Sequence, residues 1–260
     1  MAVLHDTLPV KPWMDPKLRR LPGIQPLSPE DWLRVDEAYG GQMALRVDLI
    51  DQQPEAVHAL LPEARPAAQE LYDRVLGILP GLGFGREGAV IRCPDGRCVT
   101  PDPEQPLLTL GRLVQNDFCL LQDGPGGHHV LTGAILCFPA SWTLAEKLGR
   151  GLPGIHAPVS SYDGDITARV QRLFDAIRPE QPLWRANALD YADPTLFTPR
   201  REGQAPRDHD RPRRFIRSER QCLLRLPKTR AVVFSIHTYV VRRDSLSAEE
   251  DRAFAAWKAD

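Results

Sequence analysis

Hydrophobic residues along the chain change their spacing several times, and each spacing predicts a different kind of element. Over residues 28–48, Trp32, Val35 and Tyr39 recur at helical intervals after a Ser-Pro pair that suits the start of a helix. Over residues 64–79 the apolar side chains form one stripe that ends at a Pro-Gly pair. These patterns predict two helices with those bounds.

From residue 89 onward the pattern changes to short apolar runs that are typical of strands. Residues 89–99 hold a Pro-Asp-Gly turn between two such runs, and a glycine-rich loop separates DFCLLQ from HHVLTGAILCF. Both arrangements predict hairpins. A short helix should start at Thr143, which stands at capping-box spacing from Glu146, and an amphipathic helix should cover residues 163–177.

The last third of the chain predicts a long hairpin whose register follows from its turn. The turn PKTR stands between the runs RFIRSERQCLLRL and AVVFSIHTYVV. A hairpin with this turn pairs Leu226 with Ala231 and places Arg220 opposite His237 in a mostly apolar row. If that row is buried, the guanidinium needs an anion, either from the neighbourhood of Glu219 or from a ligand. An arginine in water on an edge strand is the alternative.

The order of these elements predicts an α+β fold with an antiparallel sheet. Five prolines in the first 27 residues favour an arm that lies extended over other elements. We expect residues 1–88 to pack, as an arm with helices, on a core formed by residues 89–260, so that the chain is one compact unit. A capped helix after Ser247 should close the chain.

Composition narrows the class of protein. The 260 residues include 33 Lys plus Arg and 34 Asp plus Glu, a net charge of -1, which gives no field to attract nucleic acid. No apolar run approaches the roughly 20 residues of a membrane span. The five cysteines are scattered, and residues 1–30 lack the pattern of a secretory leader, so we expect a cytoplasmic protein. Cys93 and Cys98 have no second ligand pair at zinc-site spacing, which disfavours a metal site there.

Standard catalytic signatures are absent: the sequence has no dinucleotide-binding glycine motif, phosphate loop, nucleophile elbow or His-Glu-x-x-His. His156 is the most suggestive single residue, because Pro153 and Pro158 stiffen the backbone around it after a short helix. A stiff backbone suits a metal ligand, although a hydrogen-bonded structural histidine would fit the same pattern. Spacing alone therefore predicts only a ligand-binding α+β domain.

Several separated segments resemble one family in the same order. These segments are LPGIQPL, RVDEAY, LGRLVQNDFCLL, LTGAILCFPASWTLAEKLG, IHAPV and SERQCLLRLPKTRAVVFSIHTY. Over most of the chain they resemble the alpha-subunit family of haem-dependent oxidative N-demethylases. The resemblance implies a PAS-like curled antiparallel sheet that binds haem b. It also implies an activity, the oxidation by O2 of a small secondary amine such as dimethylamine to methylamine and formaldehyde.

The resemblance gives His156 a role as the proximal ligand of the haem iron, with His237 as the rival ligand. Arg220, Arg225 and Arg185 become candidates to bind the haem propionates, because a guanidinium matches a carboxylate with two parallel hydrogen bonds.

A cationic amine requires a carboxylate or an aromatic face, and Glu219, Tyr191 and Tyr239 are the candidates in the segments that carry the resemblance. Asn187 is a further candidate, since its amide could orient a water molecule or the amine.

The chain carries no flavin, nicotinamide or iron–sulfur motif, so its electrons must come from another protein. The resemblance implies a reductase subunit with FMN and a [2Fe-2S] cluster, and a further subunit that captures formaldehyde on tetrahydrofolate. The alternatives are a haem-PAS sensor or gas-binding module without catalysis, and a scaffold that has lost its cofactor.

Overall fold

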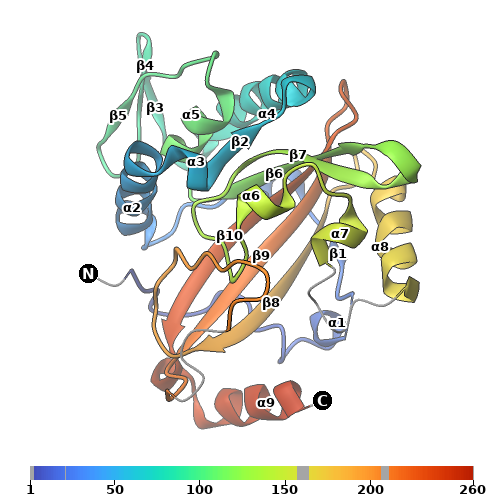
Figure 1. Cartoon of the computed structure of the whole chain (residues 1–260). Helices are drawn as coiled ribbons and strands as arrows, with labels where there is room; N and C mark the ends of the chain where they lie inside the picture. Colours follow the sequence, from blue (N-terminus) through green and yellow to red (C-terminus); the bar gives the residue numbers. More distant parts are fainter. Residues whose placement is uncertain (1–2, 21, 157–163, 206–210, 260) are drawn as a thin grey trace.

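A large, open antiparallel sheet forms the centre of the computed structural model (Figure 1). The structure describes residues 3–20, 22–156, 164–205 and 211–259, except for the side chains of His156 and residues 164–168. Helices cover both faces of the sheet, and its strands curl across the molecule, which confirms the predicted α+β class with a curled antiparallel sheet.

Seven strands form this sheet in the order β1-β8-β9-β10-β6-β7-β2, and three short strands form a separate sheet in the order β3-β4-β5. The strands are β1 (Gln25–Pro26), β2 (His58–Leu60), β3 (Gly85–Glu87), β4 (Val90–Arg92), β5 (Cys98–Val99), β6 (Asp117–Asp123), β7 (His129–Ile135), β8 (Leu183–Tyr191), β9 (Phe215–Arg225) and β10 (Val232–Arg242).

The described α-helices are α1 (Pro16–Arg19), α2 (Tyr39–Gln52), α3 (Pro54–Val57), α4 (Arg65–Ile78), α5 (Pro106–Leu113), α6 (Leu144–Lys147), α7 (Leu152–His156), α8 (Gly164–Ala176) and α9 (Ala248–Ala259). Short 3-10 helices lie at Pro29–Asp31, Pro62–Ala64, Leu79–Leu82, Pro125–Gly127 and Arg243–Ser245. The helices predicted over residues 64–79 and 163–177, the short helix after Thr143, the helix after Ser247 and all three hairpins are confirmed.

The register predicted for the last hairpin is confirmed along its length. Arg220 pairs with His237, and the backbone N–H of Leu226 donates to the carbonyl of Ala231 at 2.9 Å. However, β9 lies between β8 and β10 rather than at an edge, and Arg220 is only 1% exposed. The alternative of an exposed edge-strand arginine is therefore wrong.

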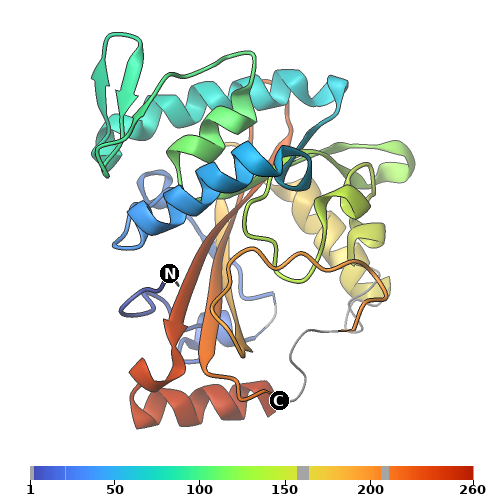
Figure 2. The same cartoon turned by 60° about the vertical axis from the view of Figure 1, so that its left-hand side comes forward.

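Successive residues of each strand point to opposite faces of the sheet, so the sheet has two different surfaces. One surface, which includes Leu224 and Val233, packs on α2, α4, α5 and the N-terminal segment, and we call it the strap face. The other, which includes Leu223 and Phe234, packs on α6, α7 and α8, and we call it the α8 face. Figure 2 shows α2, α4 and α5 as a layer across one end of the sheet.

The N-terminal strap, residues 3–20 and 22–27, crosses the strap face mostly without regular structure, as its prolines predict; α1 is its one described helix. Leu8 and Trp13 of the strap are buried in a cluster with Ile216 and Phe254. The indole Nε1 of Trp13 also donates to the carbonyl of Glu250 at 3.0 Å, so the strap is tied to α9.

The helix predicted over residues 28–48 is wrong in its first part, because α2 begins only at Tyr39. Trp32 and Leu33 are buried in the core from an irregular segment. The Asp36 carboxylate accepts a hydrogen bond from the backbone N–H of Ala38 at 3.0 Å and turns the chain before the helix. Contacts with the sheet therefore override the local helical spacing.

A buried ion pair joins the helical layer to the sheet. Arg46 of α2 donates to Asp117 Oδ1 at 2.7 Å, and both side chains are almost fully buried. The same carboxylate accepts the backbone N–H groups of Cys137 and Phe138 at 2.7 and 2.9 Å, while Arg46 also donates to carbonyls next to β6, including that of Asn116. These bonds fix the start of β6 against the end of β7.

Within the described residues, no helix is long and apolar enough to cross a membrane.

Replacing Asp117 with Asn should lower the free energy of unfolding by about 3 kcal/mol, because Arg46 then stays buried without its counter-ion. The matched control is Asp51→Asn, whose partner Arg112 forms an exposed pair at 2.6 Å and should contribute less than about 1 kcal/mol. Urea denaturation of both variants measures the difference. Equal losses in the two variants would contradict the role given to the buried pair.

Candidate functional site

The α8 face carries a polar cluster at the centre of β8 and β9. Asn187 stands opposite Glu219; its Nδ2 donates to Glu219 Oε2 at 3.2 Å, and its Oδ1 accepts the backbone N–H of Glu219 at 3.0 Å. Gln221 Nε2 donates to the same carboxylate oxygen at 3.1 Å, and a guanidinium nitrogen of Arg217 lies 3.3 Å from Oε1. Two amides and one guanidinium thus fix a buried carboxylate.

Several buried polar atoms around Glu219 have no hydrogen-bond partner among the described residues. They are Nε of Arg185, Nε of Arg217 and Oγ1 of Thr238, which pairs with Glu219 from β10. Burial without a partner costs free energy, so such atoms indicate a place where a ligand or water binds.

Arg185 is the most informative of these residues. No hydrogen bond or ion pair of its side chain is found within the described part of the chain, although the group is largely removed from solvent. Burial lowers the pKa of its guanidinium, and only the nearby Glu219 charge opposes that effect. Arg185 stands opposite Gln221 on the α8 face and is available to an anionic ligand.

An apolar region borders this polar cluster. On the sheet this region includes Leu183 and Leu223. It is covered by Leu152 and Ile155 of α7 and by Phe174 of α8. His156 is the last residue of α7, directly after Ile155, so its backbone belongs to a helix on the α8 face. The side chain of His156 lies outside the described residues.

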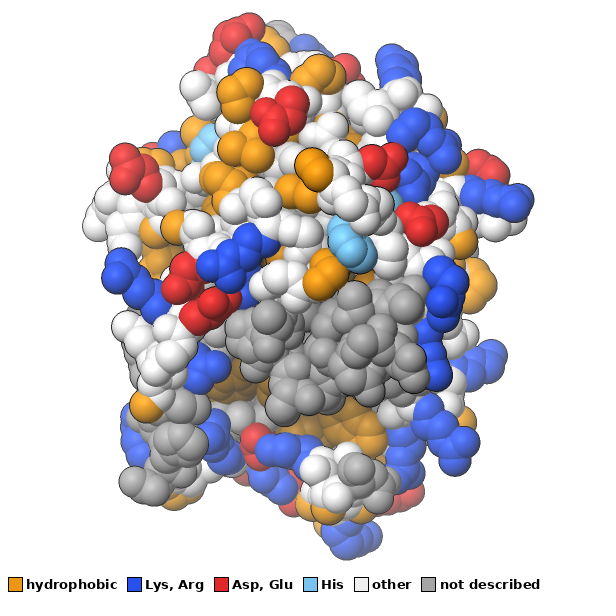
Figure 3. All heavy atoms as spheres, turned by 45° about the vertical axis from the view of Figure 1, so that its right-hand side comes forward, with side chains coloured by type: hydrophobic (Ala, Val, Ile, Leu, Met, Phe, Trp, Pro, Cys, Tyr) orange, Lys and Arg blue, Asp and Glu red, His pale blue; other side chains and the backbone are white. Residues whose placement is uncertain are grey.

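Figure 3 shows the surface near these helices. Beside the residues drawn in grey the molecule is hollowed, with hydrophobic side chains in the recess and Lys and Arg side chains around its rim. A porphyrin offers a flat apolar ring and two carboxylates. The apolar region next to an unpaired guanidinium therefore fits the chemistry of haem.

The other candidate residues on this face differ in their availability. Arg225 donates to the carbonyls of Ile177, Arg230 and Phe174 at 2.7, 2.7 and 2.5 Å, so backbone groups at the end of α8 occupy its guanidinium. Tyr191 shares the face of Asn187 but lies four residues further along β8, about 13 Å away. Burial raises the pKa of the Tyr191 phenol and the charge of Glu219 raises it further, so the hydroxyl of Tyr191 lies near the cluster of Asn187, Glu219 and Arg185.

Arg220 points to the opposite face, where Asp31 supplies its anion. Its guanidinium lies 3.1 Å from Asp31 Oδ2, donates to the carbonyls of Asp31 and Trp32 at 2.6 and 3.0 Å, and stacks 5.3 Å from the ring centroid of Trp184. The predicted anion exists, but a residue far away in the sequence provides it, rather than the neighbourhood of Glu219.

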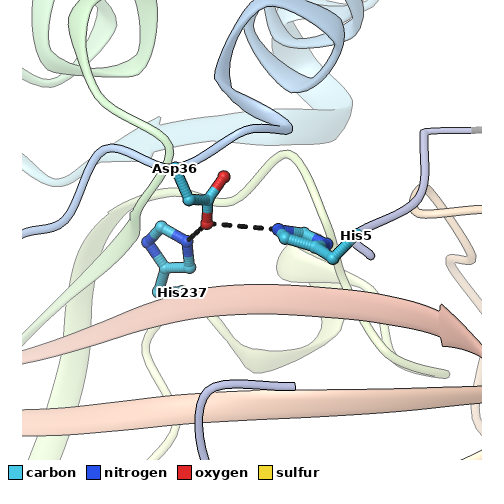
Figure 4. Close-up of side chains that lie close together, drawn as sticks. All are labelled: His5, Asp36 and His237. Carbon is cyan, nitrogen blue, oxygen red and sulfur yellow. Dashed lines mark hydrogen bonds and ion pairs between the residues drawn. The ribbon is translucent and has the colours of Figure 1, made fainter. Parts of the chain in front are cut away.

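His237 also lies on the strap face, in a cluster with His5 and Asp36 (Figure 4). Asp36 Oδ2 lies 2.8 Å from His237 Nε2 and 3.1 Å from His5 Nε2. Asp36 Oδ1 accepts Gln115 Nε2 at 2.8 Å as well as the N–H of Ala38. The carboxylate therefore receives four hydrogen bonds.

The hydrogen bonds assign the proton of His5, whereas both ring nitrogens of His237 face acceptor oxygens. His5 Nδ1 accepts the backbone N–H of Val240 at 3.2 Å, so its proton sits on Nε2 and is donated to Asp36. His237 Nδ1 lies 3.3 Å from Asn116 Oδ1, so both of its ring nitrogens are engaged inside the protein.

Burial would raise the pKa of Asp36, but hydrogen bonds from His237 and His5 outweigh that effect and hold its pKa well below its usual range. Burial lowers the pKa of His237, although Asp36 opposes that shift. The favoured state of Asp36 is therefore the ionised carboxylate.

Within the described residues, one group, His5, Asp36 and His237, has ligand atoms close enough together for a metal ion. A metal on His5 Nε2 would require the proton of that ring to move to Nδ1, where it would face the N–H of Val240. This arrangement disfavours a metal. Cys93 is buried and Cys98 is exposed, and neither belongs to this group.

A cavity of about 450 Å³ adjoins the cluster and is lined by the following strap, loop and strand residues: His5, Thr7, Pro9, Leu33, Arg34, Val35, Asp36, Glu37, Leu82 and Tyr239. Sequence reasoning missed His5 and Asp36 as partners of His237, because they come from irregular segments with no periodicity. The segment RVDEAY, which contains Asp36, was the only signal that could have indicated one of them.

Comparison with known families gives one match. The family model described as haem-dependent oxidative N-demethylase, alpha subunit-like, matches residues 23–258. The match includes both faces of the sheet and every candidate residue named above except His5, Thr7 and Pro9.

The His5–Asp36–His237 cluster should make folding sensitive to acid. The folded-state pKa of His237 lies below its ordinary value, so its contribution to stability is present above about pH 6.5 and is lost as the pH falls below that value. The folded-state pKa of Asp36 is also lowered, so its contribution is lost at still lower pH. The free energy of unfolding of the wild type should fall by up to about 1.4 kcal/mol per pH unit if unfolding takes up one proton.

His237→Gln should flatten this dependence between about pH 6.5 and pH 5, because the variant lacks the buried imidazole of His237. His128→Gln, outside the cluster, should keep the wild-type slope. Urea unfolding at several pH values measures both, and a His237→Gln slope equal to that of the wild type would contradict the assignment.

Proposed function

We propose that this chain, which belongs to the haem-dependent oxidative N-demethylase, alpha subunit-like, family, binds haem b against the α8 face of its sheet and there oxidises an N-methyl group of a small secondary amine. The observation that carries the proposal is the unpaired, largely buried guanidinium of Arg185 beside the apolar region under α7 and α8. An apolar recess with Lys and Arg side chains around its rim is complementary to the ring and the carboxylates of a haem.

Different residues of the α8 face would contact different parts of the haem. Leu183 and Ile155, which are only partly buried, would contact the apolar ring, and Arg185 would pair with a propionate. His156 would bind the iron, because it ends the helix that packs on this apolar region and because flanking prolines stiffen its backbone. Arg225 and Arg220 are less suited to propionates, since partners within the protein already occupy them.

When bound, haem supplies the activation of O2 that oxidation of a methyl carbon requires. Glu219 would attract the cationic amine, and Asn187 and Gln221 would hold its carboxylate in one orientation. Thr238 offers an unpaired hydroxyl next to that carboxylate for a water molecule or the amine. Dimethylamine fits such a site because it combines one positive charge with two methyl groups.

An alpha-subunit-like chain implies partner subunits. Electrons would come from a reductase with FMN and a [2Fe-2S] cluster, and a tetrahydrofolate-binding subunit would take up formaldehyde. The family match supports a multi-subunit enzyme, and the composition of the sequence supports an external source of electrons, because it contains no flavin or iron–sulfur motif.

Haem titration of the purified chain tests the binding site. The chain should bind haem with a Soret band, and Arg185→Met should weaken binding about tenfold or more through loss of a charge-assisted pair. Arg172→Met on the exposed side of α8 is the control and should bind as the wild type does. His156→Ala should alter the iron-ligand spectrum, whereas His237→Gln should keep it. An unchanged affinity in Arg185→Met would exclude the proposed orientation of haem.

Turnover tests the chemistry. With dimethylamine, NADPH and a cognate reductase, the haem-loaded chain should release formaldehyde, and Glu219→Gln should raise KM about tenfold or more because the variant lacks the charge that attracts the amine. Leu189→Gln, at an exposed position on the neighbouring strand β8, is the control. A haem-loaded chain that accepts electrons but releases no formaldehyde from secondary amines would favour the sensor or gas-binding alternative.

A further inference from the structure

We propose that Thr238 is the second hydrogen-bond acceptor of the amine site and that, together with Glu219, it selects amines whose ammonium ion carries two N–H groups. This inference rests on the proposed function, because it takes Glu219 as the group that attracts the amine. It goes further by assigning the contact that distinguishes a secondary amine from a tertiary one.

Thr238 and Glu219 face each other on the α8 face. They pair across β9 and β10, which lie side by side in the centre of the sheet (Figure 1). The carbonyl of Thr238 accepts Nε2 of Gln42 at 2.9 Å, so the backbone of Thr238 points away from β9, and its pair with Glu219 is a non-hydrogen-bonded one. In such a pair the Cβ atoms are about 5 Å apart. One small cation can therefore contact both side chains.

The hydroxyl of Thr238 has no hydrogen-bond partner among the described residues, Glu219 included, although the residue is only 1% exposed. The carboxylate of Glu219 is held by Asn187 and Gln221 instead, which both donate to Oε2. A buried hydroxyl without a partner costs free energy, so it indicates a place where a polar group binds.

Another buried threonine of the same sheet shows that this arrangement is specific to position 238. Thr132 of β7 is 6% exposed, and its hydroxyl donates to Gln122 Oε1 on β6 at 2.7 Å. The two residues thus share type, burial and strand environment, and they differ in whether the protein itself satisfies the hydroxyl.

The neighbours of Thr238 on β10 are apolar. Ile236 and Val240 lie two residues before and after it, on the same face of the sheet, and are 5% and 2% exposed. A hydroxyl between two aliphatic side chains, opposite the carboxylate of Glu219, matches a dimethylammonium ion, in which the N–H groups lie between two methyl groups.

The exposure of the cluster gives the direction of entry. Arg185 and Asn187 on β8 and Gln221 on β9 are partly exposed, whereas Glu219 and Thr238 are buried. The cluster therefore opens toward β8 and ends at β10. An amine that enters beside Asn187 meets the carboxylate first and the Thr238 hydroxyl at the inner end of the site.

Charge alone does not set the selectivity of this site. Secondary and tertiary ammonium ions carry the same single positive charge, so Glu219 attracts both. A guanidinium nitrogen of Arg217 lies 3.3 Å from Glu219 Oε1 and offsets part of the carboxylate charge, which increases the weight of any further contact.

The number of N–H groups does distinguish the two classes. Dimethylammonium has one N–H for Glu219 and a second for Oγ1 of Thr238, whose lone pairs can accept it. Trimethylammonium has a single N–H, which the charged carboxylate takes. A hydrogen bond to a charged group changes affinity by about tenfold, and this is the preference for the secondary amine that we expect.

Isothermal titration calorimetry of the haem-loaded chain with dimethylammonium and trimethylammonium chloride measures this preference without turnover. The parent protein should bind dimethylammonium about tenfold more tightly. Thr238→Val, which keeps the shape of the side chain, should weaken binding of dimethylammonium about tenfold and leave binding of trimethylammonium unchanged. Thr132→Val is the control and should keep the affinities of the parent.

Urea unfolding of the haem-free chain gives a second measurement that depends on neither haem nor amine. Thr238→Val should raise the urea midpoint, because it removes a buried hydroxyl that has no partner. Thr132→Val should lower the midpoint, because it removes a hydroxyl that donates to Gln122.

Four results would overturn the inference. Thr238→Val that binds both amines as the parent does would exclude the contact, and the proposed function would stand if Glu219→Gln weakens both amines in the same assay. Equal weakening of the two amines in Thr238→Val would show a change of shape rather than a lost N–H contact. A lowered urea midpoint in Thr238→Val would show that the protein itself satisfies the hydroxyl. A parent protein that binds neither amine would remove this inference and the proposed amine site together.

Discussion

The structure depends on the burial of charged groups where the helical layer meets the sheet. Arg46 and Asp117 lie at this junction without contact to solvent, and Asp117 also holds the backbone at Cys137 and Phe138. The carbonyl of Phe138 in turn accepts Arg217, which lies beside Glu219 on the α8 face. A continuous series of polar contacts therefore runs from α2, around the start of β6, to the candidate site. Because each buried charge needs its partner, the position of one element constrains the next.

The two faces of the sheet carry different chemistry because neighbouring residues of β9 and β10 alternate between them. Glu219 contributes to the α8 face and Arg220 to the strap face, although they are adjacent in sequence. On the strap face the charges are paired, since Asp31 lies beside Arg220 and Asp36 beside His237, although Nε of Arg220 has no hydrogen-bond partner among the described residues. On the α8 face the guanidinium of Arg185 has no partner among the described residues. This difference separates a surface built for attachment from one suited to an anionic ligand.

Regular elements were predictable from sequence where the signal was local. The turn PKTR set the register of β9 and β10, and the Ser247–Glu250 spacing gave a capping box that the structure contains. The start of α2 was not predictable, because Asp36 turns the chain through contacts with Gln115 and His237. Sequence placed Asn187 and Glu219 among the candidates by residue type alone. The predicted hairpin register already separated Arg220 from Glu219. The contact of Glu219 with Asn187 follows from the pairing of β8 with β9, and sequence reasoning did not identify β8.

The central claim is that haem binds on the α8 face. Leu223 and Leu224 are adjacent in β9, but Leu223 packs under α7 and α8 and Leu224 packs under the opposite helices. Paramagnetic broadening by ferric haem of their assigned methyl signals distinguishes the faces directly. The proposal predicts strong broadening at Leu223 and little at Leu224. Broadening of Leu224 with a sharp Leu223 signal would place the iron on the strap face and contradict the account.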